Sequence, residues 1–397
     1  MVSSLIFADR NRLSPFYVPK ALLHRDQQLK SLSAYFTDIL EDVWKACPRI
    51  VQLVGPVGTG KTTLARRFGQ LFMEEAEGRR VKAQFVYLNC RLEDTSKALL
   101  YQSLLGKVSP EIVSRSLGAL EMLRELLRFL RDRKMRLLLC LDEIDYFCAT
   151  SKEHVVYDLT RLSEILPDQS NLVLGVIFIA RSFEFHKCLD PSELSTLGRF
   201  HIDFPPYSAR QVYEILRSRA EEAFRLAAVA DDALEFIADL TATPQVNGDV
   251  RYALDLLFSA ALLAERDGCA KVGVEHIRKV HSEIKQAVTG DDILKLSGHA
   301  KLILLGLARF LRAGGAAYVS LSELNEGYRI VCEEYNIQPA RNYERYLQEL
   351  CDSEIVKMKS LTEFGVPNVS VEELSKALSS LASQRIKVEQ REGGKRN

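Results

Sequence analysis

The chain has 397 residues, of which 47% are hydrophobic and 27% are charged, and this balance excludes a disordered or fibrous protein. Its length suffices for two or three globular domains. Lysine and arginine together number 53, as do aspartate and glutamate. Any affinity for nucleic acid must therefore come from local patches rather than from an overall basic charge.

The cysteines and the apolar runs indicate the compartment. No two of the eight cysteines form a C-x-x-C pair, which disfavours a zinc site and a disulfide framework and is typical of reduced cytosolic thiols. The longest apolar run, residues 172–180, is much shorter than the roughly 20 residues that a membrane helix needs. We therefore predict a cytoplasmic protein with no membrane partner.

Residues 50 to about 205 alternate short, β-branched apolar runs with longer amphipathic stretches. This pattern is typical of parallel strands joined by crossover helices. The runs that we predict to be strands are residues 50–54, 84–88, 137–141, 172–179 and 200–204. The middle runs are apolar on both faces, as strands of a buried parallel sheet are. We predict an α/β domain over residues 1–207 with an open, five-stranded parallel sheet.

The remainder is predicted to be mostly helical and to form two domains. After Pro205 and Pro206, apolar residues recur at three- and four-residue spacing in 209–227, 232–241, 249–266 and 274–287. These stretches predict an all-α domain over residues 208–290. Residues 297–397 add helices at 299–312, 322–335 and 339–351 and strand-like pieces at 318–320 and 356–361. That order predicts a C-terminal winged-helix domain.

A glycine-rich segment after the first predicted strand fits the pattern G-x-x-x-x-G-K-[ST] of a phosphate-binding loop. In such a loop the backbone amides face a polyphosphate, Lys61 neutralises β- and γ-phosphate oxygens, and the Thr62 hydroxyl binds Mg²⁺. The alternative is an incidental glycine-rich turn, which the flanking strand and helix disfavour. The residues assigned to nucleotide binding here are Gly55, Pro56, Val57, Gly58, Thr59, Gly60, Lys61, Thr62 and Thr63.

Asp142 and Glu143 directly follow the apolar run 137–141, at the strand end where open α/β sheets bind ligands. We predict that Thr62 ligates Mg²⁺, that Asp142 holds the ion through its water shell, and that Glu143 polarises the water that attacks the γ-phosphate. An acidic pair after a strand also occurs where the next helix is capped. The phosphate-binding loop upstream favours the metal site. For Asp145 we favour a capping or structural role.

These two motifs, with the run G-D-V-R-Y-A-L-D-L-L at 248–257, resemble an AAA+ ATPase. Other motifs narrow the resemblance to the archaeal origin-recognition and cell-division-control family of replication initiators. They are V-P at 18–19 before H-R-D at 24–26, L-D-P at 189–191, F-P-P-Y at 204–207 and H-A-K-L-I-L-L at 299–305. The resemblance covers nearly the whole chain. It implies an ATP-binding base domain, a helical lid and a winged helix that binds origin DNA, with ATP or ADP setting the conformation.

The resemblance adds further residues to the nucleotide site: Val18, Pro19, His24 and Arg25, which flank the adenine and ribose, and Tyr207. It also makes Arg251 the lid arginine that reaches the γ-phosphate and assists catalysis. The residue type supports that role independently. The guanidinium of an arginine is always charged, and on a mobile lid it can detect a third phosphate by forming bidentate hydrogen bonds with it. A solvated arginine on a helix surface is the alternative.

Two positions depart from the family pattern. Arg181 stands where relatives usually place a polar sensor, often asparagine, after the fourth strand. Ser192 stands where they place an arginine after Asp-Pro, a candidate for contacting a neighbour's nucleotide. We therefore predict a weak ATPase that acts as a switch and is little activated by a neighbouring copy.

DNA contacts are predicted on two domains. One face of the third winged-helix helix is aromatic and aliphatic, which leaves its polar face to reach base edges and phosphates, although an ordinary amphipathic helix has the same pattern. The wing is predicted after residues 356–360 with its turn at 364–368, as a minor-groove contact or a purely structural hairpin. Relatives also carry a DNA-contacting helical insertion, expected here at 95–118. The candidate DNA contacts are Lys107, Arg115, Arg341, Asn342, Arg345, Lys357 and Lys359.

The favoured function is an ATP-switched initiator that binds double-stranded origin DNA, associates with paralogous initiator subunits and helps recruit the replicative helicase, in the cytoplasm at the nucleoid. Helicase recruitment follows from the resemblance alone. The alternative is a P-loop signalling or transcription-regulatory ATPase whose winged helix mediates protein contacts. A clamp-loader-type remodeller fits the first two domains but is disfavoured because its third domain would be an all-helical collar.

Overall fold

The computed structural model describes residues 4–41, 47–92, 96–112, 117–151, 153–165, 172–284 and 290–379. The chain forms two compact units. We call Phe16–Tyr207 the sheet unit, and Met1–Pro15 together with Ser208–Asn397 the helical unit. The finer division into domains at 1–207, 208–290 and 297–397 stays a prediction. Among the described residues, no helix has the length and apolar character needed to cross a membrane.

The sheet unit is built on five parallel strands in the order β2-β3-β4-β1-β5. They are β1 (Arg49–Val54), β2 (Ala83–Asn89), β3 (Arg136–Asp142), β4 (Val173–Ala180) and β5 (His201–Asp203). Each of the five predicted strands is confirmed, with small differences at the ends. In the register, Val54 pairs with Ala180 and Asn89 pairs with Asp142. The carboxyl ends of β1, β4, β3 and β2 therefore meet along one edge of the sheet.

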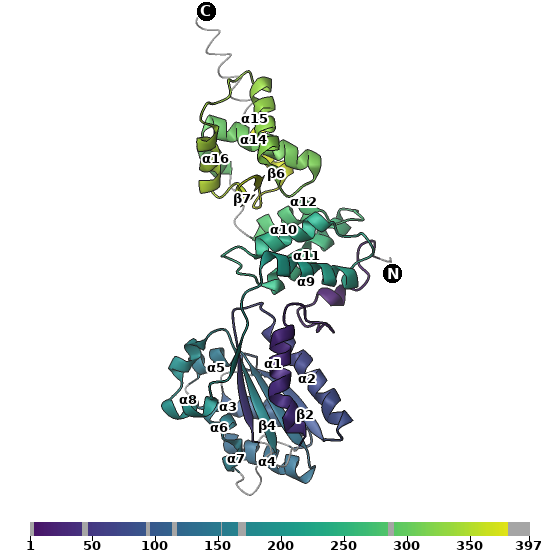
Figure 1. Cartoon of the computed structure of the whole chain (residues 1–397), viewed down its shortest axis with the longest axis vertical. Coiled ribbons are helices and arrows are strands. Elements are labelled where there is room, and N and C mark those ends of the chain that lie inside the picture. Colours follow the sequence, from purple (N-terminus) through teal and green to yellow (C-terminus); the bar gives the residue numbers. More distant parts are fainter. Residues whose placement is uncertain are drawn as a thin grey trace, which may run out of the picture. The chain divides into compact units, whose positions relative to one another are not determined.

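Helices cover both faces of this sheet (Figure 1), and a hydrophobic core lies on each face. On one face pack α1 (Asp26–Thr37) and α2 (Lys61–Gly78), and on the other pack α3 (Lys97–Val108) and α4 (Ala119–Asp132). Leu139 of β3 joins the second core and its neighbour Cys140 joins the first, because successive strand residues point to opposite faces. The remaining elements are η2 (Asp38–Leu40), α5 (Ile144–Thr150), α6 (Val155–Thr160), α7 (Leu162–Ile165), η3 (Phe183–Cys188) and α8 (Pro191–Leu197).

The helical unit confirms the predicted run of helices. After η1 (Arg10–Leu13) come α9 (Ala209–Ala223), α10 (Asp231–Thr241), α11 (Val250–Arg266) and α12 (Val274–Ile284). The C-terminal part comprises α13 (Gly290–Lys295), α14 (Gly298–Gly314), β6 (Val319–Ser320), α15 (Leu321–Glu334), α16 (Tyr343–Asp352), β7 (Lys357–Ser360) and β8 (Glu363–Gly365). Three helices and a three-stranded sheet in this order form a winged helix.

The wing hairpin turns earlier than the sequence predicts. We expected the turn at residues 364–368, but β7 and β8 pair antiparallel and the chain reverses at Leu361 and Thr362. Phe364 pairs with Met358 on one side and with Val319 on the other, and it is 2% exposed. The central position of β8 between β6 and β7 therefore buries the segment that we had assigned to the tip.

A buried arginine joins α12 to the winged helix within the helical unit. The Arg278 side chain is 1% exposed, and its guanidinium donates hydrogen bonds to the carbonyls of Ala316 (2.8 Å), Ala317 (2.9 Å) and Val366 (3.1 Å). A buried cation needs such acceptors because it has lost its water. Glu275, one turn earlier, accepts from the Ser370 hydroxyl at 2.7 Å.

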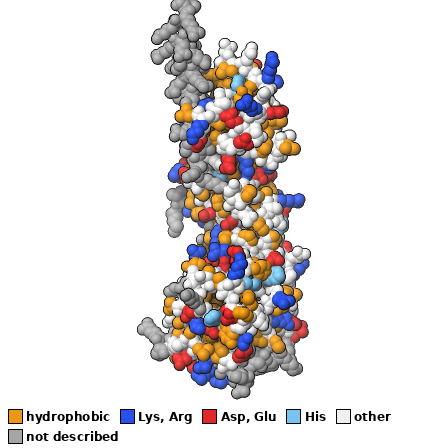
Figure 2. Space-filling view, turned by 90° about the vertical axis from the view of Figure 1, so that its left-hand side faces the viewer, with side chains coloured by type: hydrophobic (Ala, Val, Ile, Leu, Met, Phe, Trp, Pro, Cys, Tyr) orange, Lys and Arg blue, Asp and Glu red, His pale blue; other side chains and the backbone are white. Residues whose placement is uncertain are grey.

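On the face in Figure 2, lysine and arginine side chains alternate with aspartate and glutamate. This agrees with the equal numbers of acidic and basic residues.

Candidate nucleotide-binding site

The phosphate-binding loop lies between β1 and the N-terminus of α2. Gly58 and Gly60 have positive φ angles of 72° and 87°, a region that glycine enters without steric cost. A β-carbon on Gly55 would lie 2.2 Å from the carbonyl oxygen of Phe204. The glycines of the motif are therefore required by this backbone path, and the path brings the amino end of α2 to the strand edge, where helix amides attract an anion.

The loop's cationic side chain is held by the loop itself. The Lys61 ammonium donates to the carbonyls of Gly55 (2.5 Å) and Pro56 (2.6 Å), and the Thr59 hydroxyl donates to the same Pro56 carbonyl at 2.8 Å. Lys61 is only 8% exposed. These contacts keep its charge at the mouth of the loop, where a polyphosphate is a stronger acceptor than a carbonyl.

Thr62 and Asp142, which the sequence assigns to the metal, are in direct contact. The Thr62 hydroxyl donates a 2.6 Å hydrogen bond to Asp142 Oδ2, and Asp142 is 4% exposed. The Tyr87 hydroxyl donates to the same oxygen at 2.7 Å, and the Glu143 amide donates to Oδ1 at 2.9 Å. A hydroxyl and a carboxylate are the oxygen ligands that Mg²⁺ prefers, so these residues fit the ion that the motif implies.

Glu143 occupies a strained position at the end of β3. Its φ is 56°, a left-handed conformation that costs a non-glycine residue about 1 kcal/mol or more. Its Oε2 is buried and accepts no hydrogen bond from a described residue, and the nearest cation is Arg91 at 3.8 Å. This carboxylate oxygen can still accept a hydrogen bond from water, as expected of a residue that polarises the attacking water.

The two departures from the family pattern have structural partners. The Arg181 guanidinium donates to Asp145 Oδ2 at 2.9 Å, so the structural role favoured for Asp145 has a defined partner. Ser192 lies at the start of α8, where its hydroxyl donates to Asp190 at 2.7 Å. Neither position supplies the side chain that the family pattern has there.

Arg25 supports the phosphate-binding loop through hydrogen bonds to backbone carbonyls. It is 3% exposed, and its guanidinium donates to the carbonyls of Thr59 (2.9 Å) and Pro205 (2.7 Å). Tyr207 lies beneath this guanidinium, and a β-carbon on Gly60 would lie 2.9 Å from the Tyr207 hydroxyl. Val18, Pro19 and His24 precede α1 and are partly buried. Their contact with adenine and ribose, and that of Arg25, stays a prediction.

The other predicted residues are spread over both units. Lys107 lies on α3, and its ammonium donates to the Tyr87 carbonyl at 3.1 Å. Arg115 lies outside the described residues. Arg251 is exposed on the first turn of α11 in the helical unit, just after the N-cap Asp249. Its predicted contact with the γ-phosphate stays a prediction.

The candidate DNA contacts of the winged helix differ from one another. Arg341, Asn342 and Arg345 are exposed beside and on α16, whose Leu347 and Leu350 face the core. Among the described residues, none forms an ion pair with Arg341 or Arg345. The predicted division of α16 into a polar and an apolar face is therefore confirmed. Lys357 and Lys359, in contrast, contact α10.

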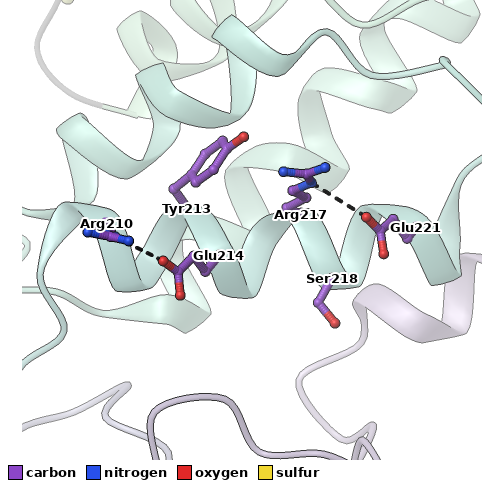
Figure 3. A pocket seen from close by; sticks show the side chains of 6 residues that line it. All are labelled: Arg210, Tyr213, Glu214, Arg217, Ser218 and Glu221. Carbon is purple, nitrogen blue, oxygen red and sulfur yellow. Dashed lines mark hydrogen bonds and ion pairs between the residues drawn. The ribbon is translucent and has the colours of Figure 1, made fainter.

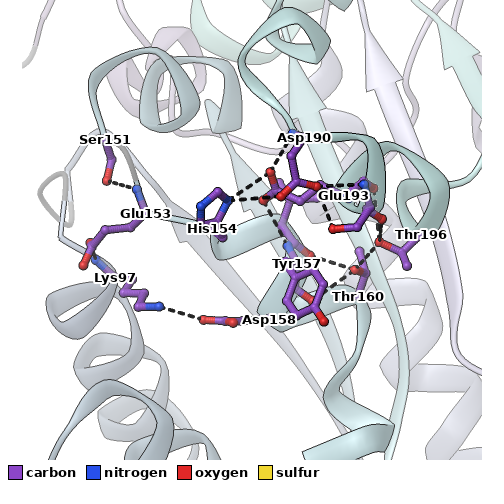
Figure 4. Close-up of polar contacts among 12 residues, drawn as sticks. Lys97, Ser151, Glu153, His154, Tyr157, Asp158, Thr160, Asp190, Glu193 and Thr196 are labelled. Atoms are coloured by element: carbon purple, nitrogen blue, oxygen red, sulfur yellow. Dashed lines mark hydrogen bonds and ion pairs between the residues drawn. The ribbon is translucent and has the colours of Figure 1, made fainter.

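Two further polar groups have structural explanations. His154, Asp190 and Glu193 bring possible metal ligands within 4.8 Å of one another (Figure 4), but Asp190 and Glu193 form the capping box of α8. A shallow groove along α9 is lined by Arg210–Glu214 and Arg217–Glu221 ion pairs of the helix itself (Figure 3). Both are common helix features.

Sequence reasoning missed Tyr87 and the bracing role of Arg25. Tyr87 carries no motif, but it lies two residues before the end of β2, whose last residue, Asn89, pairs with Asp142. A tyrosine near the carboxyl end of a strand beside β3 is the available signal, and it becomes informative only when the strand order is known.

Three family models match successive parts of the chain. They are an AAA domain at residues 47–189, a Cdc6 AAA+ ATPase-type lid domain at 213–282 and a CDC6 C-terminal winged-helix domain at 291–363. The ORC1-type DNA replication protein 2 of Saccharolobus solfataricus is 32% identical over 348 residues, which cover 87% of this chain and 84% of the relative. An ORC1-type DNA replication protein of Pyrococcus horikoshii is 30% identical over 337 residues, covering 84% and 78%.

Solved structures agree with these matches. Cdc6p from Pyrobaculum aerophilum superposes with a TM-score of 0.82 at 27% identity, covering 96% of this chain and 99% of that one. The Aeropyrum pernix ORC1 protein, solved in complex with DNA, gives a TM-score of 0.64 at 28% identity, covering 97% and 100%. The predicted fold class, with its AAA+ parallel sheet, helical lid and winged helix, is confirmed.

Proposed function

The chain belongs to the family of archaeal ORC1-type DNA replication proteins, and on that premise we propose that it is an ATP-switched initiator that binds double-stranded origin DNA. Nucleotide binding is expected of its AAA domain. In our proposal ATP and Mg²⁺ occupy the phosphate-binding loop, and the nucleotide state changes how the winged helix engages DNA. The resulting ADP form is the second state of the switch.

The contact between Thr62 and Asp142 beside the loop is the observation that carries this proposal. Both residues would hold Mg²⁺, which supplies positive charge to the β- and γ-phosphates. Lys61 would exchange the Gly55 and Pro56 carbonyls for phosphate oxygens, and the open oxygen of Glu143 would accept a proton from the attacking water. Arg251 would bring the lid to the γ-phosphate.

Slow hydrolysis suits a switch better than a motor. Arg181 is paired with Asp145, and Ser192 donates hydrogen bonds to Asp190, the N-cap of α8. The chain therefore offers neither the usual polar sensor nor the usual arginine for a neighbour's nucleotide. We propose that the ATP state persists long enough to be read by DNA and protein partners.

DNA binding is proposed through α16 and the wing. The exposed Arg341 and Arg345 can reach phosphates and base edges, and the relative from Aeropyrum pernix was solved with DNA. Association with paralogous initiator subunits and recruitment of the replicative helicase rest on the family alone.

The test compares the unaltered protein with Lys61→Ala and with Lys82→Ala, an exposed lysine of the sheet unit. We expect labelled ATP and ADP to bind the unaltered protein and Lys82→Ala alike, and Lys61→Ala at least about tenfold more weakly, because a charge-assisted contact to phosphate is lost. Equal, undetectable binding to all three proteins would overturn the nucleotide switch.

A second experiment tests DNA binding. Fluorescence anisotropy with origin-derived and random duplexes, each with ATP and with ADP, should show tighter binding to the origin duplex and a dependence on the nucleotide. Equal affinity for both duplexes in both nucleotide states would favour a winged helix that serves protein contacts.

A further inference from the structure

Tyr87 reaches the metal side of the site from a strand that carries no part of either motif. Its hydroxyl and the Thr62 hydroxyl both donate to Asp142 Oδ2, at 2.7 and 2.6 Å. The Glu143 amide fixes the other carboxylate oxygen at 2.9 Å. Three donors therefore set the orientation of Asp142, and only two of them come from motif residues.

The position of Tyr87 is fixed independently of Thr62. Tyr87 pairs with Cys140 and Asn89 with Asp142 in the β2–β3 register, and the Arg66 guanidinium lies 4.4 Å from the centroid of the Tyr87 ring. The sheet register and the Arg66 guanidinium therefore place the Tyr87 hydroxyl against Asp142.

We propose that Tyr87 is a positioning residue for divalent-cation binding at the nucleotide site. A cation that took the Thr62 hydroxyl as a ligand would remove that donor from Asp142, and Tyr87 would then be the side chain that keeps the carboxylate oriented. This inference rests on the proposed nucleotide site and assigns to it a residue outside the sequence motifs. Residues that orient a metal ligand typically change metal affinity by about 10- to 100-fold when removed.

The test uses Tyr87→Phe, which removes one hydroxyl. Tyr101→Phe is a matched control, because Tyr101 is also a tyrosine of the sheet unit that donates to a carboxylate, Asp158, at 2.9 Å. Nucleotide binding is titrated with Mg²⁺, and binding of Mn²⁺ to the nucleotide complex is followed by electron paramagnetic resonance. We expect the cation midpoint of Tyr87→Phe to rise about tenfold or more, with binding in EDTA unchanged, and that of Tyr101→Phe to stay the same.

A cation midpoint equal to that of the unaltered protein overturns the role of Tyr87, as does an equal rise in Tyr101→Phe. Tyr87→Leu provides a second variant if Tyr87→Phe lacks the circular dichroism of the folded protein, with the same expected rise. Failure of the proposed function has a different signature, since the unaltered protein would then bind no nucleotide with or without Mg²⁺.

A separate observation concerns the wing. The Lys359 ammonium lies 3.3 Å from Asp239 Oδ2 and 3.6 Å from Glu235 Oε2, both on α10. It also lies 5.1 Å from the ring centroid of Tyr318. The Lys357 ammonium donates to the Asp239 backbone carbonyl at 3.4 Å. Both basic residues of β7 therefore contact the same turn of α10.

The α10 contacts distinguish the wing from α16. The Asp239 side chain is 19% exposed and that of Lys359 is 31% exposed, so the pair is partly shielded from water and is stronger than a fully solvated pair. Arg341 and Arg345 are exposed and form no ion pair with a described residue. In this conformation the cations beside and on α16 are available to phosphate, whereas those of the wing are engaged.

We infer that α10 and the wing form an intramolecular latch, in which Glu235 and Asp239 occupy the wing lysines in place of DNA phosphates. A carboxylate and a phosphate compete for the same ammonium group, so DNA that uses the wing must first displace it from α10. This inference rests on the DNA-binding part of the proposed function. It identifies the wing lysines as the basic groups that are kept from DNA, and Glu235 and Asp239 as the acidic groups that bind them.

The test measures whether loss of the α10 carboxylate increases the affinity of the protein for DNA. Asp239→Asn should bind a duplex about threefold or more tightly at low salt, and its log affinity should fall more steeply with log salt by roughly one unit, since each lysine that gains a phosphate contact adds about 0.9 to the slope. Asp231→Asn is the matched control, because it removes the same charge from α10 at a residue bound to Tyr213. Adding Lys359→Ala to Asp239→Asn should abolish the gain.

Unchanged affinity of Asp239→Asn, or an equal gain in Asp231→Asn, overturns the latch. A gain that survives Lys359→Ala overturns it as well, because the wing lysine would then play no part. If the unaltered protein and all variants bind no duplex, the DNA-binding function itself fails.

Discussion

The guanidinium of Arg25 lies 3.9 Å from the ring centroid of Tyr207. Arg25 precedes α1 and Tyr207 ends the sheet unit, so this contact joins the two ends of the unit behind the phosphate-binding loop. The same guanidinium holds the Thr59 carbonyl. The loop is thereby supported by residues far from it in the sequence.

We expect Arg25→Ala to lower the free energy of unfolding by about 2 kcal/mol, because buried carbonyls lose charged donors. The loop should also bind nucleotide more weakly. Urea unfolding followed by circular dichroism and nucleotide titration check both effects. Arg161→Ala is the control, since Arg161 lies over the Tyr157 ring at 4.6 Å on another part of the same unit. Equal losses in both variants would show that stacking alone matters.

Glu143→Gln should separate binding from hydrolysis. The amide keeps the size of the side chain but cannot accept a proton from water, so single-turnover phosphate release should fall about 100-fold or more. Nucleotide affinity should stay within about twofold, because Thr62 and Asp142 are untouched. Phosphate release that persists at the original rate would show that another group activates the water.

Arg345→Ala should weaken binding to a cognate duplex more than to a random one, because its exposed guanidinium on α16 is placed to reach base edges. A lost base contact costs about 1–3 kcal/mol of discrimination. Lys357→Ala should weaken both complexes alike. The check is a pair of anisotropy titrations per variant, and equal losses for Arg345→Ala on the two duplexes would remove it from the base-reading residues.

Stability should fall on mild acidification because of His186. Burial, and then the charge of His201, lowers the pKa of His186 below the usual 6.5. The folded protein thus binds this proton less tightly than the unfolded chain. The contribution of His186 to stability is therefore fully present above pH 6.5 and is lost as pH falls from there through the lower pKa of the folded protein. The melting temperature should drop between pH 7.5 and 5.5, and by less in His186→Gln. An identical drop in that variant would assign it to other groups.

The strands and the phosphate-binding loop could be predicted because their signals are local. A buried parallel strand is a short apolar run, and the glycines of the loop are needed for a backbone path that only glycine follows, as at Gly58 and Gly60. The acidic pair followed from its place after β3. The residues that determine each of these features lie within a few positions of one another in the sequence.

The contacts that the sequence did not reveal depend on strand order and on packing over long separations. Tyr87 meets Asp142 because β2 is the neighbour of β3. The wing turn was placed too late because Phe364 is buried by pairing with Val319, which precedes it by more than forty residues. Lys357 and Lys359 looked like solvent-exposed charges because nothing near them in the sequence indicates α10.

The burial of Arg278 has a practical consequence for work on isolated pieces of the chain. A fragment that starts at residue 297 would leave the carbonyls of Ala316, Ala317 and Val366 without the guanidinium that they share. A fragment that stops before residue 290 would leave the same guanidinium without these three carbonyls, with only Glu275 of α12 as its partner. Expression trials should therefore keep residues 208–397 together, and Met1–Pro15 belong to the same unit.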